Sequence, residues 1–181
     1  MHTEETKLKG CFIIEPRIFN DSRGYFFESF NQKAFDQIIG KETIFVQDNE
    51  SYSTKGVLRG LHYQTGEFSQ AKLVRVIKGK VLDVAVDIRD GSATFGQHVC
   101  VELSEENKRQ LFVPRGFAHG FIVLSDVAIF SYKCDNYYNK ESEGGIIYND
   151  PTLAIDWQLE ETEFIVSEKD KTLPKLIDAR L

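Results

Sequence analysis

Apolar and polar residues alternate with a period of two along most of this chain. Between positions 81 and 88, for example, Leu82, Val84 and Val86 would share one face of an extended strand, opposite Asp83. Eight further segments combine this pattern with many β-branched and aromatic residues: 24–30, 43–51, 57–63, 72–77, 98–103, 110–113, 120–124 and 128–133.

Residues typical of turns separate these segments. A glycine occurs at each of four such places, 21–24, 78–80, 90–92 and 114–116, and Asp or Pro accompanies it at three of them. Many short strands at regular spacing predict an all-β fold, either an antiparallel sandwich or a barrel.

One segment has the pattern of an amphipathic helix. Asn31 is a suitable N-cap, an apolar stripe follows at Phe35 and Ile38, and Gly40 can end the helix. A second short helix or turn is expected after Ser167.

Composition narrows the class of protein. The chain has 181 residues, of which 28 are acidic and 22 are Lys or Arg, so its formal net charge is −6. This length fits one domain over residues 1–181, with a short C-terminal arm. An acidic balance argues against a general nucleic-acid binder and against a protein anchored to an anionic membrane.

The N-terminal residues and the cysteines indicate the compartment. Residues 2–7 are polar and lack the apolar core of a signal peptide, and no apolar run reaches membrane-spanning length. Cys11, Cys100 and Cys134 are odd in number and widely spaced, which argues against a disulfide framework or a zinc knuckle. We therefore expect a cytoplasmic protein.

Polar side chains occur within several predicted strands, where burial is costly unless they line a pocket. Arg59 and His62 would point to opposite faces of a regular strand. If both reach one pocket, the strand needs an irregularity, for which Gly60 is the natural place. The alternative is that Arg59 simply faces solvent. Further polar residues of this kind are Gln47, Asp48, Asn49, Lys72, Asp83 and Tyr132.

A proline and two glycines mark residues 113–120 and predict a fixed loop that aims His119. The spacing Pro-x-Gly-x-x-His resembles the second motif of the cupin superfamily, whose fold is a double-stranded β-helix, or jelly-roll barrel. Many cupins also bind a metal through a His-x-His pair, but here His62 is followed by Tyr63 and Gln64. We therefore expect a cupin-type barrel without a metal site.

Three of these side chains form a set suited to acid–base chemistry. The His62 imidazole can act as a base, and either Asp170 or Asp83 could fix its tautomer. The Lys72 ammonium can stabilise a developing oxyanion, and the Tyr132 hydroxyl can donate a proton from another direction. Together they suit an epimerase or isomerase that removes a proton beside a carbonyl and needs no cofactor. Taken singly, each residue has an equally good structural explanation: His62 as a structural histidine, Lys72 as a surface lysine and Tyr132 as a core tyrosine.

Seven longer motifs follow one another along the chain. They are DSRGYF at 21–26, FVQDN at 45–49, GVLRGLHYQ at 56–64, KLVR at 72–75, VAVDIR at 84–89, VPRGFAHGF at 113–121 and YK at 132–133. In this order they resemble the dTDP-4-dehydrorhamnose 3,5-epimerase family, over about residues 12–170.

The resemblance implies a reaction at the two carbons beside the C4 ketone of dTDP-4-dehydro-6-deoxy-D-glucose, which gives dTDP-4-dehydro-L-rhamnose. By motif, His62 is the base and Asp170 orients it. Tyr132 is the acid on the opposite face, and Lys72 stabilises the enolate oxygen. The positions that match substrate contacts are Arg23, Glu28, Gln47, Asp48, Asn49, Arg59, His119, Glu143 and Lys169, together with Tyr138 against the nucleotide.

The resemblance also implies a homodimer with strand exchange between subunits. Asp83 is a weaker candidate for a site residue, as a partner of Lys72. Phe19 and Phe26 are candidates for lining a nucleotide site.

Two alternatives remain open from the sequence. One is an enzyme of the same fold that inverts a single centre of a related dTDP-4-keto-6-deoxy sugar, or a ketoisomerase. The other is a non-catalytic cupin-like module that binds a sugar nucleotide. A base, a cation and an acid together argue against the second, because binding alone does not need that set.

Overall fold

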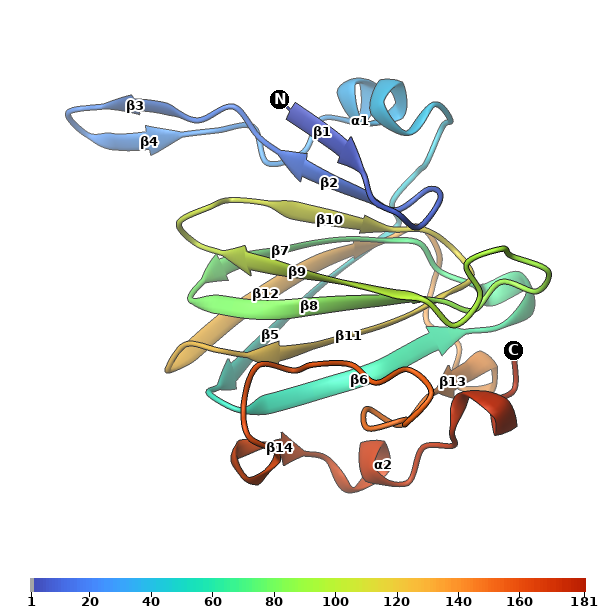
Figure 1. The fold of residues 1–181 in the computed structure, drawn as a ribbon. Helices are drawn as coiled ribbons and strands as arrows, with labels where there is room; N and C mark the ends of the chain where they lie inside the picture. Colours follow the sequence, from blue (N-terminus) through green and yellow to red (C-terminus); the bar gives the residue numbers. More distant parts are fainter. Residues whose placement is uncertain (1) are drawn as a thin grey trace.

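Two antiparallel sheets face each other and enclose the core of this computed structural model, which describes residues 2–181 (Figure 1). The first sheet has the order β1 (His2–Glu5), β2 (Phe12–Glu15), β10 (Gln110–Val113), β7 (Lys72–Lys78), β12 (Val127–Cys134) and β5 (Gln47–Thr54). The second has the order β13 (Glu143–Gly145), β6 (Val57–Gln64), β11 (Phe117–Val123), β8 (Lys80–Asp87) and β9 (His98–Ser104), and β14 (Ile165–Val166) pairs with β6 in parallel. This is the jelly-roll arrangement that the sequence predicted.

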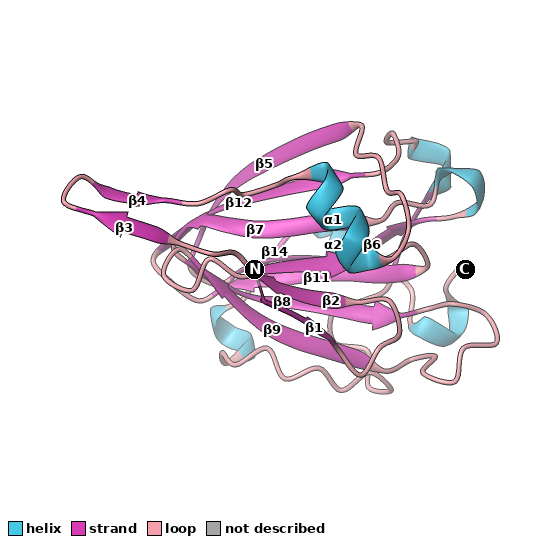
Figure 2. Cartoon of the chain, turned by 90° about the horizontal axis from the view of Figure 1, so that it is seen from above, coloured by secondary structure: helices cyan, strands magenta, loops and turns pink. Residues whose placement is uncertain are grey.

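A separate hairpin projects from the barrel (Figures 1 and 2). It consists of β3 (Phe19–Asp21) and β4 (Gly24–Phe26). The predicted strand at 24–30 therefore ends at Phe26, where the pairing with Phe19 stops. The strands β1 and β2 carry no clear alternation in the sequence and were not predicted.

Both predicted helices are confirmed. In α1 (Gln32–Ile39), the Asn31 side chain accepts a hydrogen bond from the Ala34 N–H, and Gly40 ends the helix in the left-handed conformation. Ser167 caps α2 (Glu168–Lys171). Four short 3₁₀ segments complete the regular structure: η1 (Gly66–Phe68), η2 (Lys140–Ser142), η3 (Glu161–Glu163) and η4 (Leu176–Asp178). No helix within residues 2–181 is long and apolar enough to cross a membrane.

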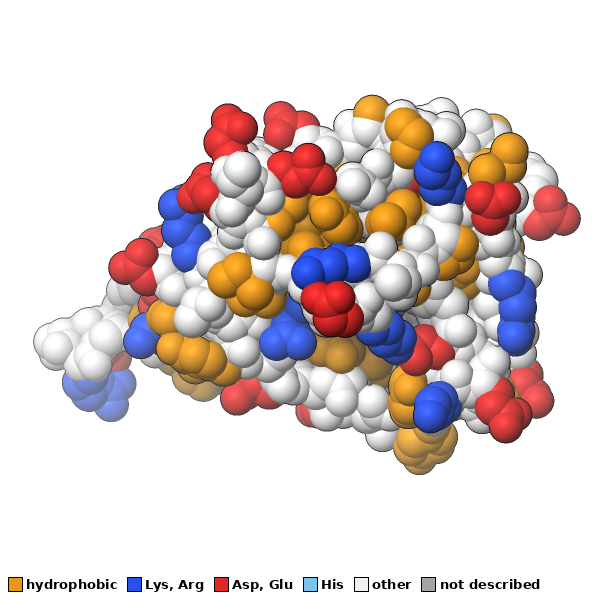
Figure 3. All heavy atoms as spheres, turned by 90° about the horizontal axis from the view of Figure 1, so that it is seen from below, with side chains coloured by type: hydrophobic (Ala, Val, Ile, Leu, Met, Phe, Trp, Pro, Cys, Tyr) orange, Lys and Arg blue, Asp and Glu red, His pale blue; other side chains and the backbone are white. Residues whose placement is uncertain are grey.

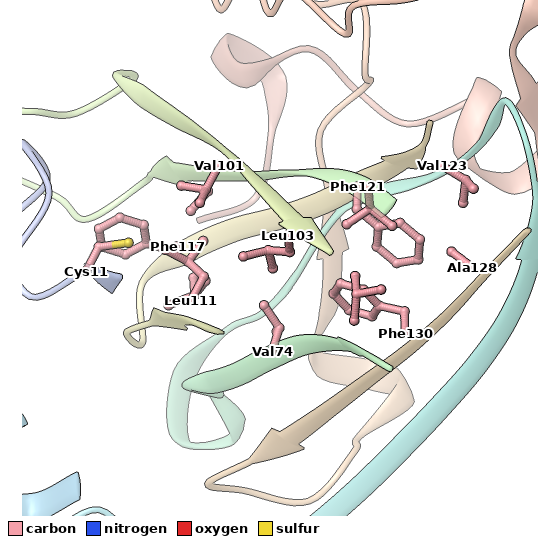
Figure 4. Packing of buried hydrophobic residues seen from close by; sticks show 14 of the residues in the cluster. Cys11, Val74, Val101, Leu103, Leu111, Phe117, Phe121, Val123, Ala128 and Phe130 are labelled. Atoms are coloured by element: carbon pink, nitrogen blue, oxygen red, sulfur yellow. The ribbon is translucent and has the colours of Figure 1, made fainter. Parts of the chain in front are cut away.

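The core between the sheets is apolar and joins them directly. Phe121 of β11 and Phe130 of β12 stack with their ring centroids 4.1 Å apart, so the contact connects one sheet to the other (Figure 4). A second cluster lies on the outer side of the second sheet, where Leu176 near the C-terminus packs with Trp157. The backbone N–H of Leu176 donates to Asp150 and holds the C-terminal residues against this sheet.

An ion pair at the end of β8 joins the buried carboxylate of Asp87 to the partly exposed guanidinium of Arg89. Asp87 is fully buried and accepts hydrogen bonds from Arg89, Ser92 and Thr94. The guanidinium of Arg89 also lies 4.6 Å from the centroid of the Phe117 ring. Burial opposes ionisation of Asp87, but its hydrogen bonds outweigh this effect and hold its pKa well below the usual range.

Asp87→Ala is expected to lower the free energy of unfolding by about 3 kcal/mol at neutral pH, because Arg89 is left without its charged partner. The folded-state pKa of Asp87 is depressed, so its stabilisation is present above the unfolded pKa of about 3.9 and fades as the pH falls further. Urea unfolding at a series of pH values measures both effects. The exposed neighbour Asp90→Ala is the control and should change stability little. Equal effects of the two variants at neutral pH would contradict the role given to Asp87.

Candidate active site

A cavity of about 520 Å³ opens between the two sheets. The second sheet contributes Arg59, His62 and His119, and the first sheet contributes Lys72 and Tyr132. The segment that includes β14 and α2 also lines the cavity, through Ile165, Val166, Ser167, Lys169 and Asp170. Seen from below, the surface of the molecule shows several Lys and Arg side chains close to an acidic one, next to apolar side chains (Figure 3).

An irregularity at Gly60 brings Arg59 and His62 into this one cavity, as the sequence predicted. The pairing of β6 with β11 changes register here: His119 lies opposite His62, whereas Phe121 lies opposite Arg59. Gly60 has a φ of +131°, and a Cβ there would lie 2.6 Å from the Cα of Gly120. Glycine is therefore required at this position for both conformation and space.

His62 and Asp170 form a hydrogen-bonded pair at the cavity. The distance from His62 Nε2 to Asp170 Oδ1 is 2.7 Å, and Asp170 is only 3% exposed. The Ser167 hydroxyl, which accepts from the Asp170 N–H, fixes the start of the short helix, and the Gly60 N–H also donates to the carboxylate. Burial opposes ionisation, but the bond from His62 prevails and lowers the pKa of Asp170. The carboxylate therefore stays charged and orients the imidazole, and Nδ1 of His62 has no hydrogen-bond partner within residues 2–181.

A second buried pair involves Asp83, and it differs from both predictions for that residue. His119 Nε2 lies 2.9 and 3.0 Å from the two carboxylate oxygens of Asp83, so Asp83 orients His119 rather than His62 or Lys72. His119 was also expected on a loop, but β11 already begins at Phe117 and places this histidine within the strand. The pleat of β11, and not the loop, directs its side chain toward the cavity.

Lys72 and Tyr132 lie on the opposite wall from His62. Lys72 Nζ is 6.0 Å from the centroid of the Tyr132 ring, and no partner within residues 2–181 forms an ion pair or hydrogen bond with this ammonium. Burial lowers the pKa of Lys72, while the charges of Asp83 and Glu143 act in the other direction. Burial also raises the pKa of Tyr132, which keeps its hydroxyl protonated near neutral pH.

The guanidinium of Arg59 forms no ion pair with any carboxylate within residues 2–181. Its Nε and Nη2 atoms both donate to the Ser53 hydroxyl, at 3.2 and 3.1 Å. This contact holds the side chain in place while leaving its positive charge available to an anion.

A second cavity of about 350 Å³ adjoins the first and shares His62, Lys72 and Tyr132 with it. Tyr138 Oη donates to Glu143 Oε2 at 3.3 Å, and the other oxygen of Glu143 pairs with the ammonium of Lys169 at 2.7 Å. This bond to Lys169 lowers the pKa of Glu143 in spite of its burial, so both groups stay charged. The other residues that line this second cavity are Gln47, Asn49, Tyr63, Gln64 and Gln70.

Three predicted substrate contacts lie outside these two cavities. Arg23 is at the exposed tip of the hairpin, where it pairs with Asp21 at 2.6 Å. Glu28 accepts a hydrogen bond from Asn31 at the start of α1. Asp48 faces the outer side of the first sheet and pairs with Lys133. The two aromatic candidates for the nucleotide site, Phe19 and Phe26, are also on the projecting hairpin and line neither cavity.

Two polar residues of β5 were not predicted as site residues. Ser51 lines the larger cavity and Ser53 holds Arg59. Both lie on the inward face of β5 with Gln47 and Asn49, which were predicted. Continuing the period-two alternation from those two residues would have identified Ser51 and Ser53 as well. Across residues 2–181, no group of three or more His, Cys, Asp or Glu side chains lies together in a way that could hold a metal ion.

The profile of the dTDP-4-dehydrorhamnose 3,5-epimerase family matches residues 5–178 of this chain. The chain belongs to that family. This epimerase is 54% identical to the dTDP-4-dehydrorhamnose 3,5-epimerase of Escherichia coli K12, over 100% of this chain and 99% of the relative. The family and the kind of enzyme that the sequence motifs indicated are thereby confirmed.

Solved structures of similar proteins agree with the epimerase fold. A dTDP-4-dehydrorhamnose 3,5-epimerase from Elizabethkingia anophelis NUHP1 is 57% identical and superposes with a TM-score of 0.95, covering 98% of this chain and 97% of that one. A dTDP-6-deoxy-D-glucose-3,5-epimerase from Legionella pneumophila, solved in complex with dTDP-4-keto-L-rhamnose, is 54% identical, with a TM-score of 0.93 and coverage of 98% and 94%. The predicted jelly-roll fold is thereby confirmed.

Proposed function

We propose that this epimerase converts dTDP-4-dehydro-6-deoxy-D-glucose to dTDP-4-dehydro-L-rhamnose without a cofactor. One observation carries the proposal: the base His62 and the acid Tyr132 come from opposite sheets and face the same cavity. A substrate carbon held between them has a proton acceptor on one side and a proton donor on the other. This is the arrangement that inversion of a carbon beside a ketone needs.

Each inversion is a pair of proton transfers. Nδ1 of His62 removes the proton from the carbon beside the ketone, and the electrons of the broken C–H bond form an enolate whose oxygen carries the negative charge. Lys72 stabilises that oxygen. Tyr132 then returns a proton to the opposite face, so the carbon is inverted. Exchange with solvent restores the proton on Tyr132 and removes the one on His62. The same cycle at the second carbon completes the reaction.

The remaining charged groups support binding of the nucleotide part. Arg59 and Lys169 supply positive charge around the cavities, and His119 adds a hydrogen-bonding ring, which together suit a diphosphate. Tyr138 offers an exposed aromatic face for the thymine ring. Cys11, Cys100 and Cys134 are free thiols, which supports the predicted cytoplasmic setting.

Conversion of the substrate tests this proposal. The purified protein is incubated with dTDP-4-dehydro-6-deoxy-D-glucose, and proton NMR couplings of the sugar ring report the configuration at C3 and C5. We expect a product inverted at both carbons. A product inverted at one carbon would support the single-centre alternative, and an unchanged substrate would support the binding module.

We further propose that the enzyme is a homodimer in which the hairpin of one subunit reaches the site of the other. Three aromatic residues of the hairpin are at least half exposed: Phe19, Tyr25 and Phe26. An exposed apolar surface of this kind marks an interface. The arm projects away from its own barrel, which explains why Arg23 is absent from the cavity of its own chain (Figure 2). Arg23 of the partner subunit would then supply the missing contact.

Mixing two impaired variants tests this arrangement. Arg23→Ala is expected to raise KM by about tenfold or more, because a charged hydrogen bond to the diphosphate is lost. His62→Ala removes the base. Random re-association of equal amounts of the two variants should restore about one quarter of the native sites, since half the dimers are mixed and each has one intact site. Assays at low substrate concentration measure the recovery. No recovery after verified subunit exchange would place Arg23 in the site of its own chain.

A further inference from the structure

Tyr138 stands on an irregular segment between β12, which ends at Cys134, and η2, which begins at Lys140. Tyr138 is 56% exposed, so packing does little to fix the direction of its side chain. A flexible aromatic would have to be ordered each time a ligand binds, and this ordering weakens binding. The segment must therefore be held by other groups if Tyr138 is to present a fixed surface.

The side chain of Gln64 holds this segment in place with several hydrogen bonds. Gln64 lies at the end of β6 and is 8% exposed. Its Nε2 donates to the carbonyl oxygens of Phe68, at 2.7 Å, and Tyr137, at 3.1 Å. Its Oε1 accepts from the backbone N–H of Asn139 at 2.7 Å. Both hydrogens of the amide group and its oxygen are thus used, which leaves no donor hydrogen for a ligand.

These contacts fix the backbone on both sides of Tyr138. The carbonyl of Tyr137 belongs to the peptide plane before it, and the N–H of Asn139 belongs to the plane after it. Because each peptide unit is planar, holding both units fixes the direction of the bond from Cα to Cβ of Tyr138. The Tyr138 N–H adds a third contact, to Gln47 Oε1 at 3.2 Å.

The tip of the ring is tied to the same place in the second sheet. The hydroxyl of Tyr138 donates to Glu143, and Glu143 lies directly opposite Gln64 in the pairing of β13 with β6. The two ends of the tyrosine are therefore held by neighbouring residues of one ladder.

We infer that Gln64 is a positioning residue for nucleotide recognition: its side-chain amide holds Tyr138 in the orientation that receives the nucleobase. The inference rests on the proposed role of Tyr138 at the nucleotide. Gln64 acts through the backbone of residues 137–139 and has no part in proton transfer, so its loss affects binding rather than chemistry.

A double-mutant cycle tests this inference. Gln64→Met keeps the length of the side chain and removes its hydrogen bonds. We expect KM for the dTDP-sugar to rise between about twofold and tenfold, the equivalent of ordering one side chain, with kcat within about twofold of the native value. In a Tyr138→Ala background the same change should leave KM unaltered, because the residue that Gln64 positions is gone. Gln110→Met, which removes another buried amide that donates to a backbone carbonyl, is the control and should leave KM unchanged.

Each other outcome has a definite meaning. The inference would be overturned if Gln64→Met raised KM equally in the native and Tyr138→Ala backgrounds. It would also be overturned if Tyr138→Ala raised KM and Gln64→Met alone did not. No effect of Tyr138→Ala on KM would overturn the role of Tyr138 itself, and the inference with it. If Gln64→Met does not fold, Gln64→Asn replaces it in the same cycle. The shorter side chain of asparagine stays polar but cannot reach the three backbone groups, so the same outcomes apply.

Discussion

Replacing His62 by alanine is expected to lower kcat by about 100- to 10,000-fold and to stop exchange of the substrate's C3 and C5 protons with solvent. The other histidine that lines the cavity, His119, is a poor substitute as base because only 7% of its side chain is exposed, against 33% for His62. The turnover number and deuterium uptake from D₂O measure the two effects separately.

A matched histidine outside the site provides the control. His98 lies in β9, is partly buried and lines neither cavity. His98→Ala should therefore retain native turnover and exchange. Continued exchange in His62→Ala at the native rate would remove His62 from the role of base.

Tyr132→Phe is expected to separate exchange from inversion. His62 remains, so the proton beside the ketone still leaves, and deuterium still enters on the face from which the proton was taken. The donor on the opposite face is gone, so net epimerisation should fall by about 100-fold or more while exchange persists. Mass spectrometry of the recovered substrate measures exchange, and NMR measures the configuration.

Tyr148→Phe is the comparison for this variant. Tyr148 packs edge-on against Phe164 outside both cavities, and its hydroxyl has no place in the proposed chemistry. It should keep both exchange and inversion. Native epimerisation by Tyr132→Phe would contradict the assignment of the acid.

The local patterns of the sequence were enough to predict elements whose signals are local. Alternation identified β8, and a capping residue with a following glycine identified α1. The change of register at Gly60 was also predictable, because Arg59 and His62 could not otherwise share a cavity. What was missed depends on partners distant in the sequence. Asp83 and His119 are 36 positions apart, and nothing in either segment shows that they bond to each other.

The position of the hairpin could not be predicted from the sequence either. The motif at 21–26 matched the family, but a match along one chain does not say in which subunit a residue acts. Only the projection of the arm from the barrel separates Arg23 from the cavity of its own chain (Figures 1 and 2). The role of Gln64 was hidden for a related reason, because its partners are backbone groups of residues 68, 137 and 139 that carry no sequence signal.

We propose that one cavity, with a base on one sheet and an acid on the other, inverts two carbons of the same sugar. Deuterium content of the product formed in D₂O tests it most directly. We expect the native enzyme to give dTDP-4-dehydro-L-rhamnose with one deuterium at C3 and one at C5. Deuterium at only one of these carbons, or at neither, would contradict it.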